Sequence, residues 1–546
     1  MCGILGGNNP AWDYEMGIEA IRHRGPDGEK IEKYNDITLA FCRLAIQDLS
    51  DRAMQPLSSP DQMVHIVYNG EIYGYQQLKK ELQQKYQFKT SSDTEIMLYA
   101  YLEYGETFMD KVDGIFALAV YDERKQKIHL YRDRMGVKPL YYYYYNDNFA
   151  FASELKALEA AVGTDCLTVD NFALYDYLFY RYVPEPKTMY KEICKLRPAS
   201  ILTYDVKKKK IIDNHRYWNL DVNTTVERKR KKEELSEELR DLIRKTVQEQ
   251  LISDVPVGTF LSGGIDSSII TFEAHKTDNR VKAFSIGFQE AQYDESQRAK
   301  LFCQKCGIQL EHKILANSDV GKIRNNLSKW YDEPFADVSA YPTYLVSEFA
   351  KEKCTVVLTG DGGDELFGGY EHYMGMYVLG DSLTFQDVCG IYTKDAVSVE
   401  DFRIKWGIPE DYDPYWHYRQ YYIEDLPIVT RMRYLDVMTY LPESILTKVD
   451  RVSMAVSLEA RVPFLAKKIV EFAFSLSQEE YFSENELKGC LKATYKDIIP
   501  EDVLFGIKMG FGVPGNYLWR EKHEQNLYAG VLKTQWKELD GMVFAV

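Results

Sequence analysis

Hydrophobic and polar positions divide the chain into a β-rich N-terminal part and a later part in which strands and helices alternate. Up to about Tyr190, short apolar runs are separated by turns. One such run spans residues 114–121; a polar turn follows at 122–127, and the apolar run 128–131 then returns, as expected for a β-hairpin. The tyrosine run 141–145 is also typical of a strand, and we expect it to pack between layers rather than to stack nucleic-acid bases.

An amphipathic helix opens the later part. It follows charged stretches at 207–210 and 227–234, which we interpret as solvated linker and helix surface. Because 546 residues exceed what one hydrophobic core usually serves, we expect a first domain at 1–190, a connector at 191–234 and a second domain at 235–546. The apolar residues that mark one face of the helix are Leu235, Leu239, Leu242, Ile243, Val247 and Leu251.

Strand and helix patterns alternate beyond this helix. Apolar runs at 257–261, 281–288 and 354–359 predict buried strands, and the segments from Ser267 onward and at 293–306 predict helices. This alternation predicts a doubly wound parallel α/β sheet, whose ligands bind at the carboxyl ends of the strands. The chain after Arg431 is predicted to be mainly helical.

Composition and charge restrict the partners. The chain is 45% hydrophobic and 27% charged, which is ordinary for a folded protein. Its formal net charge of −16 argues against the basic face that nucleic-acid binding requires. No stretch approaches the roughly 20 apolar residues of a membrane helix, and the N-terminus lacks a signal segment. We therefore expect a cytoplasmic protein that binds neither nucleic acid nor membrane.

Cys2 is the first candidate for catalysis among nine cysteines, whose scatter is typical of reduced thiols. If Met1 is removed, Cys2 carries both a thiol and a free α-amine with a pKa of roughly 8, so one residue can supply nucleophile and base. The alternative is a small hydrophobe near a chain end. Cys303 and Cys306 form one Cys-x-x-Cys pair, which we interpret as helix packing rather than a zinc or redox site.

The sequence SGGIDSS at 262–268 is the second candidate. It follows a strand and opens a helix, an arrangement in which backbone N–H groups cradle phosphate. It lacks the Gly-Lys-Ser/Thr ending of a Walker loop. Asp266 would repel a phosphate unless a cation lay between them, so the loop implies bound Mg²⁺.

This loop resembles the pyrophosphatase loop (PP-loop) of enzymes that adenylate a carboxylate or carbonyl group with ATP. Together with the N-terminal Cys-Gly-Ile, it makes nearly the whole chain resemble the family of glutamine-hydrolysing asparagine synthetases. Further matching segments are RHRGPDG at 22–28, RLAI at 43–46, YNGEIY at 68–73, SDTE at 92–95, RDRMGVKPL at 132–140, TGDGGDELFGGY at 359–370, KVDRVSM at 448–454, SLEARVPFL at 457–465 and KMGFGVP at 508–514.

For the first domain, the resemblance implies an N-terminal-nucleophile glutaminase (glutamine amidotransferase) with a four-layer αββα sandwich. Cys2 would attack the side-chain amide of L-glutamine, while Arg43 and Asp93 would bind the substrate's α-carboxylate and α-ammonium groups. His23 is interpreted as part of a structural or gating loop. By the same resemblance the oxyanion is stabilised by Asn69 and the Gly70 N–H, and Glu71 helps to hold the glutamine.

For the second domain, the resemblance implies an ATP-dependent synthetase, a ligase that releases AMP and pyrophosphate. Residues 359–370 follow a strand and should reach the same sheet edge as residues 262–268. Asp266 and Asp364 would bind Mg²⁺. Lys448 and Lys508 would bind pyrophosphate and supply positive charge to it and to the acyl-adenylate, with Lys508 also counted as catalytic. The ATP pocket would be lined by Phe260, Ser262, Gly263, Gly264, Asp266, Ser267, Ser268, Ile286, Thr359 and Gly360.

Two departures from the family pattern leave the acceptor open. Asp361 stands where many members carry the Glu that is credited with taking a proton from ammonia, and Ala466 stands where the family usually has Asp. The leading hypothesis is L-aspartate, amidated to asparagine through β-aspartyl-AMP. The alternative is another carboxylate, such as a uronic-acid sugar or a peptide side chain. Asp361 keeps a carboxylate, although with shorter reach.

Three other classes of protein share parts of this pattern. A catalytically idle binding protein on the same folds would not need Cys2, Asp93, Asp266 and Lys508. A tRNA-modifying enzyme would need a basic docking surface. Phosphoribosyl and sugar-phosphate amidotransferases share only the first domain and lack residues 262–268. The expected partners are therefore L-glutamine, ATP and L-aspartate or another carboxylate, with a homodimer as the candidate assembly.

Overall fold

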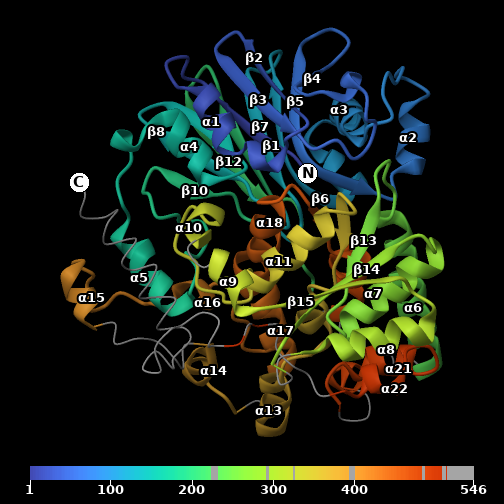
Figure 1. The fold of residues 1–546 in the computed structure, drawn as a ribbon. Helices are drawn as coiled ribbons and strands as arrows, with labels where there is room; N and C mark the ends of the chain where they lie inside the picture. Colours follow the sequence, from blue (N-terminus) through green and yellow to red (C-terminus); the bar gives the residue numbers. More distant parts are fainter. Residues whose placement is uncertain are drawn as a thin grey trace.

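Three β-sheets organise the protein, as seen in a computed structural model that describes residues 1–222, 231–290, 294–323, 326–380, 382–392, 400–482, 486–506, 512 and 514. Two sheets are six-stranded and antiparallel and come from the N-terminal part; the third is five-stranded and parallel and comes from the later part. Figure 1 shows the N-terminal strands, blue to teal, above the parallel sheet and its helices, green to red.

The first antiparallel sheet has β1 near its centre, so that Cys2 leads directly into a strand whose five residues are all buried. Strand β1 pairs with β3 on one side and with β9 on the other. In spatial order the strands are β10 (Ile193–Lys195), β8 (Tyr141–Tyr145), β9 (Asn148–Ala152), β1 (Gly3–Gly7), β3 (Ile37–Arg43) and β2 (Gly28–Tyr34).

The second antiparallel sheet contains the predicted hairpin, which is confirmed because β6 and β7 pair around the polar turn. Its longest pairing joins β5 to β6 over ten residues each. In spatial order the strands are β12 (Lys210–Arg216), β11 (Ser200–Asp205), β7 (Lys127–Arg132), β6 (Asp113–Asp122), β5 (Val64–Tyr73) and β4 (Leu57–Ser58).

These two sheets pack face to face with helices outside, which confirms the expected αββα sandwich. Ile4 and Phe41 of the first sheet share a core with Val67 and Leu130 of the second. Helices α1 (Tyr14–Ala20) and α4 (Leu155–Val162) cover the outer face of the first sheet, and α2 (Gln76–Leu82) and α3 (Asp93–Tyr104) cover that of the second. Both faces of each sheet are therefore covered, which explains the nearly continuous apolar runs of its inner strands.

The tyrosine run forms β8 but only part of it packs between layers. Tyr141 and Tyr143 are buried under helices, whereas Tyr144 and Tyr145 are exposed. The expected connector at 191–234 also contains sheet structure, because β10, β11 and β12 all lie within it. The charged residues at 207–210 include the turn between β11 and β12. Paired strands thus extend to Arg216, and the division into domains stays a prediction.

The parallel sheet confirms the predicted doubly wound α/β arrangement. The chain runs outward from β13 (Val257–Phe260) to β14 (Lys282–Phe288) and β15 (Leu310–Leu315), then returns to β16 (Val356–Leu358) and β17 (Glu459–Arg461) on the other side of β13. The reversal makes the gap between the ends of β13 and β16 a topological switch point, where such sheets bind ligands. Strands β15 and β17 were not predicted.

Helices account for most of the remaining described residues. The predicted amphipathic helix is α6 (Lys232–Gln250), with Leu239, Ile243 and Val247 fully buried. No described helix is long and apolar enough to cross a membrane. The other helices are α5 (Asn171–Tyr180), α7 (Ile265–Thr277), α8 (Ser296–Cys306), α9 (Asn317–Ile323), α10 (Leu327–Trp330), α11 (Ala340–Lys351), α12 (Gly363–Phe367), α13 (Glu371–Leu379), α14 (Phe385–Tyr392), α15 (Glu400–Lys405), α16 (Trp416–Arg419), α17 (Ile428–Met438), α18 (Thr447–Met454), α19 (Lys467–Phe474), α20 (Gln478–Tyr481), α21 (Gly489–Tyr495) and α22 (Glu501–Leu504).

Candidate active sites

Cys2 borders a cavity at the edge of the second sheet. Its backbone N–H donates to Asn69 Oδ1 at 2.9 Å, and its Sγ lies 3.8 Å from the Leu44 carbonyl oxygen. Desolvation raises the pKa of the Cys2 thiol, although the nearby α-ammonium of Met1 opposes this shift. The thiol therefore needs a base to remove its proton before it can act as a nucleophile.

Two hydrogen-bond donors of β5 lie near Cys2, namely the side-chain amide of Asn69 and the backbone N–H of Gly70. Asn69 is fully buried, and within the described residues its Nδ2 has no hydrogen-bond partner. The backbone N–H groups of Tyr68 and Ile72 point away from β6, toward Gln55 and Asp93. Because alternate residues of an antiparallel strand present their N–H groups to the same side, the Gly70 N–H also points to this edge, where Gly70 lines the cavity.

Gly70 cannot carry a side chain here. An added Cβ would overlap the Ile115 carbonyl oxygen and lie 2.5 Å from Cβ of Phe116 on the neighbouring strand. The absence of a side chain therefore allows β5 to pair closely with β6 at this position. The Asn69 amide and the Gly70 N–H are the candidate donors for an oxyanion.

Arg43 and Asp93 bring opposite charges to the same cavity. The Arg43 guanidinium donates to the Ser50 carbonyl at 2.8 Å and to that of Asp48, which fixes its direction. Asp93 is the first residue of α3, and its Oδ2 accepts from Tyr68 Oη at 2.9 Å and from the Ile72 N–H at 3.1 Å. Burial raises the pKa of Asp93 to about 6, while these hydrogen bonds oppose the shift. A guanidinium and a carboxylate are the pair that an α-amino acid requires.

Glu71 connects this cavity to the parallel sheet. Its carboxylate accepts from Gln47, and Oε1 lies 3.4 Å from Nη2 of Arg461, which sits on β17 and is fully buried. Burial raises the pKa of Glu71 well above its usual value, and Arg461 opposes this shift. The Arg461 carbonyl oxygen accepts from the Thr359 N–H at 2.9 Å, so one residue touches both candidate sites.

Met1 fills the space between Cys2 and the parallel sheet. Its α-ammonium lies 3.0 Å from Oε2 of Glu459, and both groups are fully buried. Its side chain packs in one small apolar cluster with Leu44, Ile46, Val356 and Met454, residues from both halves of the protein. Removal of Met1 would leave a space that leads from Cys2 toward β16.

The second site lies at the switch point of the parallel sheet. Residues 262–268 connect β13 to α7 and bond to one another: the Gly264 N–H donates to Ser262 Oγ at 3.2 Å, and Ser262 Oγ lies 3.1 Å from Ser267 Oγ. Gly263 has φ +92°, a conformation that favours glycine, and an added Cβ would lie 3.0 Å from the Glu295 carbonyl oxygen. Ser268 is fully buried.

The loop after β16 packs directly on the first loop. A Cβ added to Gly360 would lie 2.7 Å from the Ser267 backbone nitrogen and 2.9 Å from Asp266 Cβ. Thr359 precedes it, and Phe260 ends the neighbouring strand β13. Ile286 lies on β14, two residues beyond Phe284, which pairs with Phe260. The residues predicted to bind ATP therefore gather at one edge of the sheet.

Lys488 lies between the two predicted metal ligands. Its Nζ is 2.6 Å from Asp364 Oδ1 and also pairs with Asp266 Oδ2. Burial opposes the charge of Lys488, but the two carboxylates raise its pKa above the ordinary value. The sequence analysis missed this lysine, because its only local signal is one charged residue before α21. Its position shows that the carboxylates can share a cation.

Asp266 and Asp364 fit Mg²⁺ in the chemistry of their donors, since this ion prefers carboxylate and phosphate oxygens. Within the part of the chain that the structure describes, no group of three or more His, Cys, Asp or Glu side chains is arranged to hold a metal. The protein would therefore supply two ligands, and phosphates of a bound nucleotide would supply others. This division is typical of Mg²⁺ sites in nucleotide-using enzymes.

Asp361 and Lys448 face the same region. Burial raises the pKa of Asp361, and the charge of Lys448 opposes this shift. Lys448 is the second residue of α18, and its Nζ donates to Ser339 Oγ at 2.9 Å and lies 3.4 Å from Asp337 Oδ2. Lys508, the other predicted pyrophosphate ligand, lies outside the described residues.

Ala466 occupies the N-cap position of α19, where it offers no side-chain hydrogen bond. The N–H of Lys467 instead donates to Oδ2 of Asp113 at 3.2 Å. Asp113 begins β6, in the N-terminal part of the protein. A carboxylate from the other half thus accepts from the first N–H of the helix, whereas the side chain of a capping Asp would accept from the N–H of the second or third helical residue.

Comparison with known proteins finds two family models that together match most of the chain. Residues 1–218 match the family model described as glutamine amidotransferase domain, and residues 238–543 match the model described as asparagine synthase. Asparagine synthetase (glutamine-hydrolyzing) 1 of Bacillus subtilis is 34% identical over 94% of this chain and 87% of its own length. Putative asparagine synthetase (glutamine-hydrolyzing) 2 of Methanocaldococcus jannaschii is 38% identical over 66% of this chain and 72% of its own.

Other matches carry names other than asparagine synthetase. A Gibberella zeae protein named amidase chry2 is 28% identical over 66% of this chain and 56% of its own length. Among solved structures, glutamine phosphoribosylpyrophosphate amidotransferase from B. subtilis aligns at 16% identity over 74% of this chain and 89% of its own. The TM-score of that alignment is 0.31, too low to establish a common fold.

Proposed function

The chain belongs to the asparagine synthase family with an N-terminal glutamine amidotransferase domain, and from this premise we propose that it transfers the amide nitrogen of glutamine to aspartate. The family is ATP-dependent. The observation that carries the proposal is the cavity lined by Cys2, Arg43 and Asp93, with Asn69 hydrogen-bonded to the Cys2 N–H beside it. This cavity presents a nucleophile, an oxyanion donor and two charges that fit an amino acid.

Glutamine hydrolysis would begin at Cys2 once Met1 is removed. The α-amine of Cys2 takes the thiol proton, and Asn69 Oδ1, which already accepts from this nitrogen, orients it. Sγ then attacks the side-chain amide carbon, and the oxygen that becomes negative is met by Asn69 Nδ2 and the Gly70 N–H. Ammonia leaves with a proton from the α-amine, and water releases glutamate from the thioester.

Activation of the acceptor would occur at the switch point. A carboxylate oxygen attacks the α-phosphorus of ATP, and the bond to pyrophosphate breaks, with Lys448 near the departing charge. Asp266 and Asp364 would hold Mg²⁺, which supplies positive charge to the phosphates when bound. Ammonia then attacks the acyl carbon, AMP leaves, and Asp361 is the proposed acceptor of the surplus proton.

The path of ammonia is supported by the position of Met1. Its side chain contacts Val356 on β16, the strand that leads to Thr359 and Gly360, and the space it fills begins beside Cys2. An enclosed passage keeps ammonia away from water, where it would be protonated. Tyrosine and apolar side chains between the two halves are proposed to form its walls.

Aspartate is the proposed acceptor, and other carboxylates are the alternatives. One relative of comparable coverage is named an amidase, so the family includes proteins with other names. Asp361 and Ala466 are the residues of this chain that depart from the usual pattern. Both lie in the half that activates the acceptor, so they favour testing a range of acceptors.

The experiment combines isotope labelling with an acceptor panel. Purified protein is incubated with amide-¹⁵N glutamine, ATP, Mg²⁺ and either L-aspartate, glucuronate or an aspartate-containing peptide, and products are identified by mass spectrometry. We expect ¹⁵N-asparagine, AMP and pyrophosphate with aspartate only. AMP release without asparagine would reject aspartate as the acceptor. Cys2→Ala should abolish labelling from glutamine but retain asparagine formation from ammonium chloride.

A further inference from the structure

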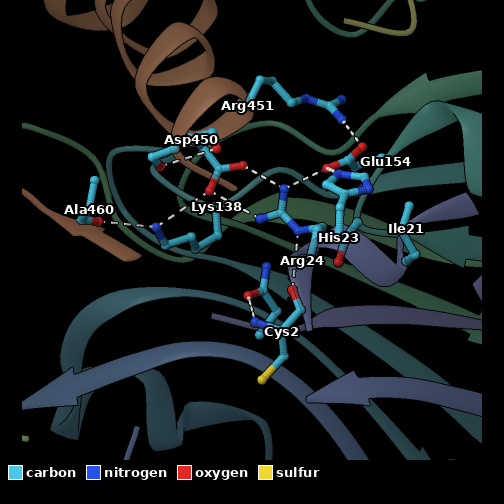
Figure 2. A network of polar contacts seen from close by, with 12 residues as sticks. Cys2, Ile21, His23, Arg24, Lys138, Glu154, Asp450, Arg451 and Ala460 are labelled. Carbon is cyan, nitrogen blue, oxygen red and sulfur yellow. Dashed lines mark hydrogen bonds and ion pairs between the residues drawn. The ribbon is translucent and has the colours of Figure 1, made fainter. Parts of the chain in front are cut away.

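Three sequence motifs of the chain meet at the boundary between the two halves (Figure 2). They are RHRGPDG at 22–28, RDRMGVKPL at 132–140 and KVDRVSM at 448–454. Figure 2 shows Arg24 at the centre of the contacts between them, between Cys2 and Asp450. The motifs lie far apart in the sequence, so their contact is a property of the folded protein.

Arg24 uses its whole guanidinium group in these contacts. Nε donates to the Cys2 carbonyl oxygen at 3.1 Å. Nη1 and Nη2 donate to the two carboxylate oxygens of Asp450 at 2.8 and 3.1 Å, and Nη1 also donates to Glu154 Oε1 at 2.7 Å. A planar guanidinium held at three edges can neither rotate nor shift without breaking several contacts.

Asp450 connects this group to the ATP half. It lies on α18, two residues after Lys448, whose side chain contacts Ser339 and Asp337. Helix α18 therefore carries both the proposed pyrophosphate ligand and the carboxylate that holds Arg24. A shift of α18 would move both groups together.

The surrounding charges are buried and balanced. Arg24, Lys138 and Arg451 face the carboxylates of Asp450, Glu154 and Asp332, and all six side chains are at most 3% exposed. Lys156, which is 19% exposed, also contacts Glu154. In such a cluster the removal of one partner leaves an uncompensated charge away from water. The helix and the guanidinium are thus tied to one relative position.

We propose that Arg24 is a positioning residue through which helix α18 sets the orientation of Cys2. The two-pronged contact with Asp450 directs the guanidinium, and its Nε–H fixes the carbonyl group of Cys2 and hence the direction of Sγ. Glutamine would then be hydrolysed efficiently only when α18 is in place, together with Lys448, the proposed pyrophosphate ligand on that helix. This inference rests on the proposed function, since it assumes that Cys2 is the nucleophile.

Neighbouring residues provide a matched control. Arg451 lies on the same helix, is equally buried and pairs with Glu154 and Asp332 at 2.8 and 2.9 Å, but no contact joins it to Cys2. His23 lies 3.2 Å from Glu154 and likewise has its side chain directed to that carboxylate rather than to Cys2. Only the contacts of Arg24 lead from α18 to the nucleophile within the described network.

The test compares Asp450→Asn with Arg451→Lys in the full-length protein. We expect Asp450→Asn to lower kcat for glutamine hydrolysis about tenfold or more, because Sγ is misdirected, with KM nearly unchanged because Arg43 and Asp93 are intact. Ammonia-dependent AMP release should continue, which shows that the variant is folded. Arg451→Lys should keep kcat for glutamine close to the wild-type value. Equal loss in both variants would overturn the proposal, because it would indicate general damage to the cluster.

A double-mutant cycle closes the test. Arg24→Lys keeps the positive charge, but an ammonium group lacks the planar set of donors with which the guanidinium binds Cys2 and Asp450 at once. We therefore expect kcat for glutamine hydrolysis to fall about as much as in Asp450→Asn. The double variant should lose no more than the worse single variant, whereas additive losses would overturn the proposal. If Asp450→Asn does not fold, kcat of Arg24→Lys decides. Absence of glutamine hydrolysis in the wild type would instead reject the proposed function.

Discussion

The α-ammonium of Met1 lies 3.0 Å from Oε2 of Glu459, and neither group is exposed to solvent. Burial raises the pKa of the Glu459 carboxyl. The positive charges of Met1 and Arg461 outweigh this effect and lower the pKa to about 2. Met1 is thus held by a charge from the parallel sheet while its side chain occupies the space beside Cys2. This arrangement makes the presence of Met1 decisive for glutamine hydrolysis and for the passage of its ammonia.

We predict that protein which retains Met1 cannot hydrolyse glutamine. The nitrogen of Cys2 is then an amide, which cannot take the thiol proton, and the space beyond it is filled. The retained form is produced by inhibiting methionine aminopeptidase during expression and is verified by intact mass. Ammonia-dependent AMP release serves as the control for folding and should persist. Glutamine hydrolysis at the normal rate by the retained form would contradict the α-amine as base.

The raised pKa of Asp93 predicts that glutamine binding weakens at acidic pH. Its pKa is raised to about 6, so the free protein carries a neutral carboxyl group below that pH, and a neutral carboxyl cannot pair with an ammonium group. We expect kcat/KM for glutamine to fall about tenfold per pH unit below pH 6, since protonation of the free enzyme controls this quantity.

Tyr68→Phe sharpens this test. The Tyr68 hydroxyl donates to Asp93 and lowers its pKa. Its removal should therefore move the inflection of the kcat/KM profile to higher pH, while kcat at high pH stays similar. An unchanged inflection in this variant would assign the acid limit to another group.

The position of Lys488 between two carboxylates predicts that the stability of a variant without this lysine depends on Mg²⁺. Lys488→Met removes the cation between Asp266 and Asp364, and two partly buried carboxylates then repel each other, at a cost of up to about 3 kcal/mol in the free energy of unfolding. Added Mg²⁺ should restore part of this loss, so Tm should rise more with Mg²⁺ in the variant than in the wild type.

Lys492→Met provides the control for Lys488. Lys492 lies on α21 close to Lys488 and pairs with Glu486 at 2.6 Å, but Glu486 is 39% exposed. Its loss should change the free energy of unfolding by about 0.5 kcal/mol or less and should not alter the effect of Mg²⁺. A similar Mg²⁺ response in both variants would argue against a metal at Asp266 and Asp364.

The close packing at Gly360 predicts that a side chain there impairs the ATP-dependent activity. The methyl group of Gly360→Ala would lie 2.7 Å from the Ser267 nitrogen and push the two loops apart. We expect ATP-dependent product formation to fall on the order of 100-fold, as is typical of a displacement near 1 Å in a catalytic arrangement. Gly375→Ala, where an added Cβ meets nothing within 4 Å, is the matched control and should retain activity. Equal activity of both variants would contradict the close packing of the loops.

Local patterns were sufficient to predict the elements around residues 262–268, but not β5 and α3 beside Cys2. The strand before residues 262–268, the helix after them and the strand before Thr359 each have apolar periodicity of their own, so their loops could be placed at one sheet edge. Strand β17 was missed because its residues are Glu459, Ala460 and Arg461, which give no apolar signal. The strands between 193 and 216 were missed because charged residues in a hairpin turn suggest a linker.

The sequence by itself indicated the hairpin of the N-terminal part and the main strands and helices of the parallel sheet, and its motifs indicated Cys2 and residues 262–268 as sites, because periodicity and loop chemistry are local. Only the tertiary structure decided which charges meet. Arg24 and Asp450 are 426 positions apart, and Lys488 reaches Asp266 across 222. A buried charge is costly unless opposite charges or hydrogen bonds compensate it, and the chain brings these distant partners together only when its sheets have assembled.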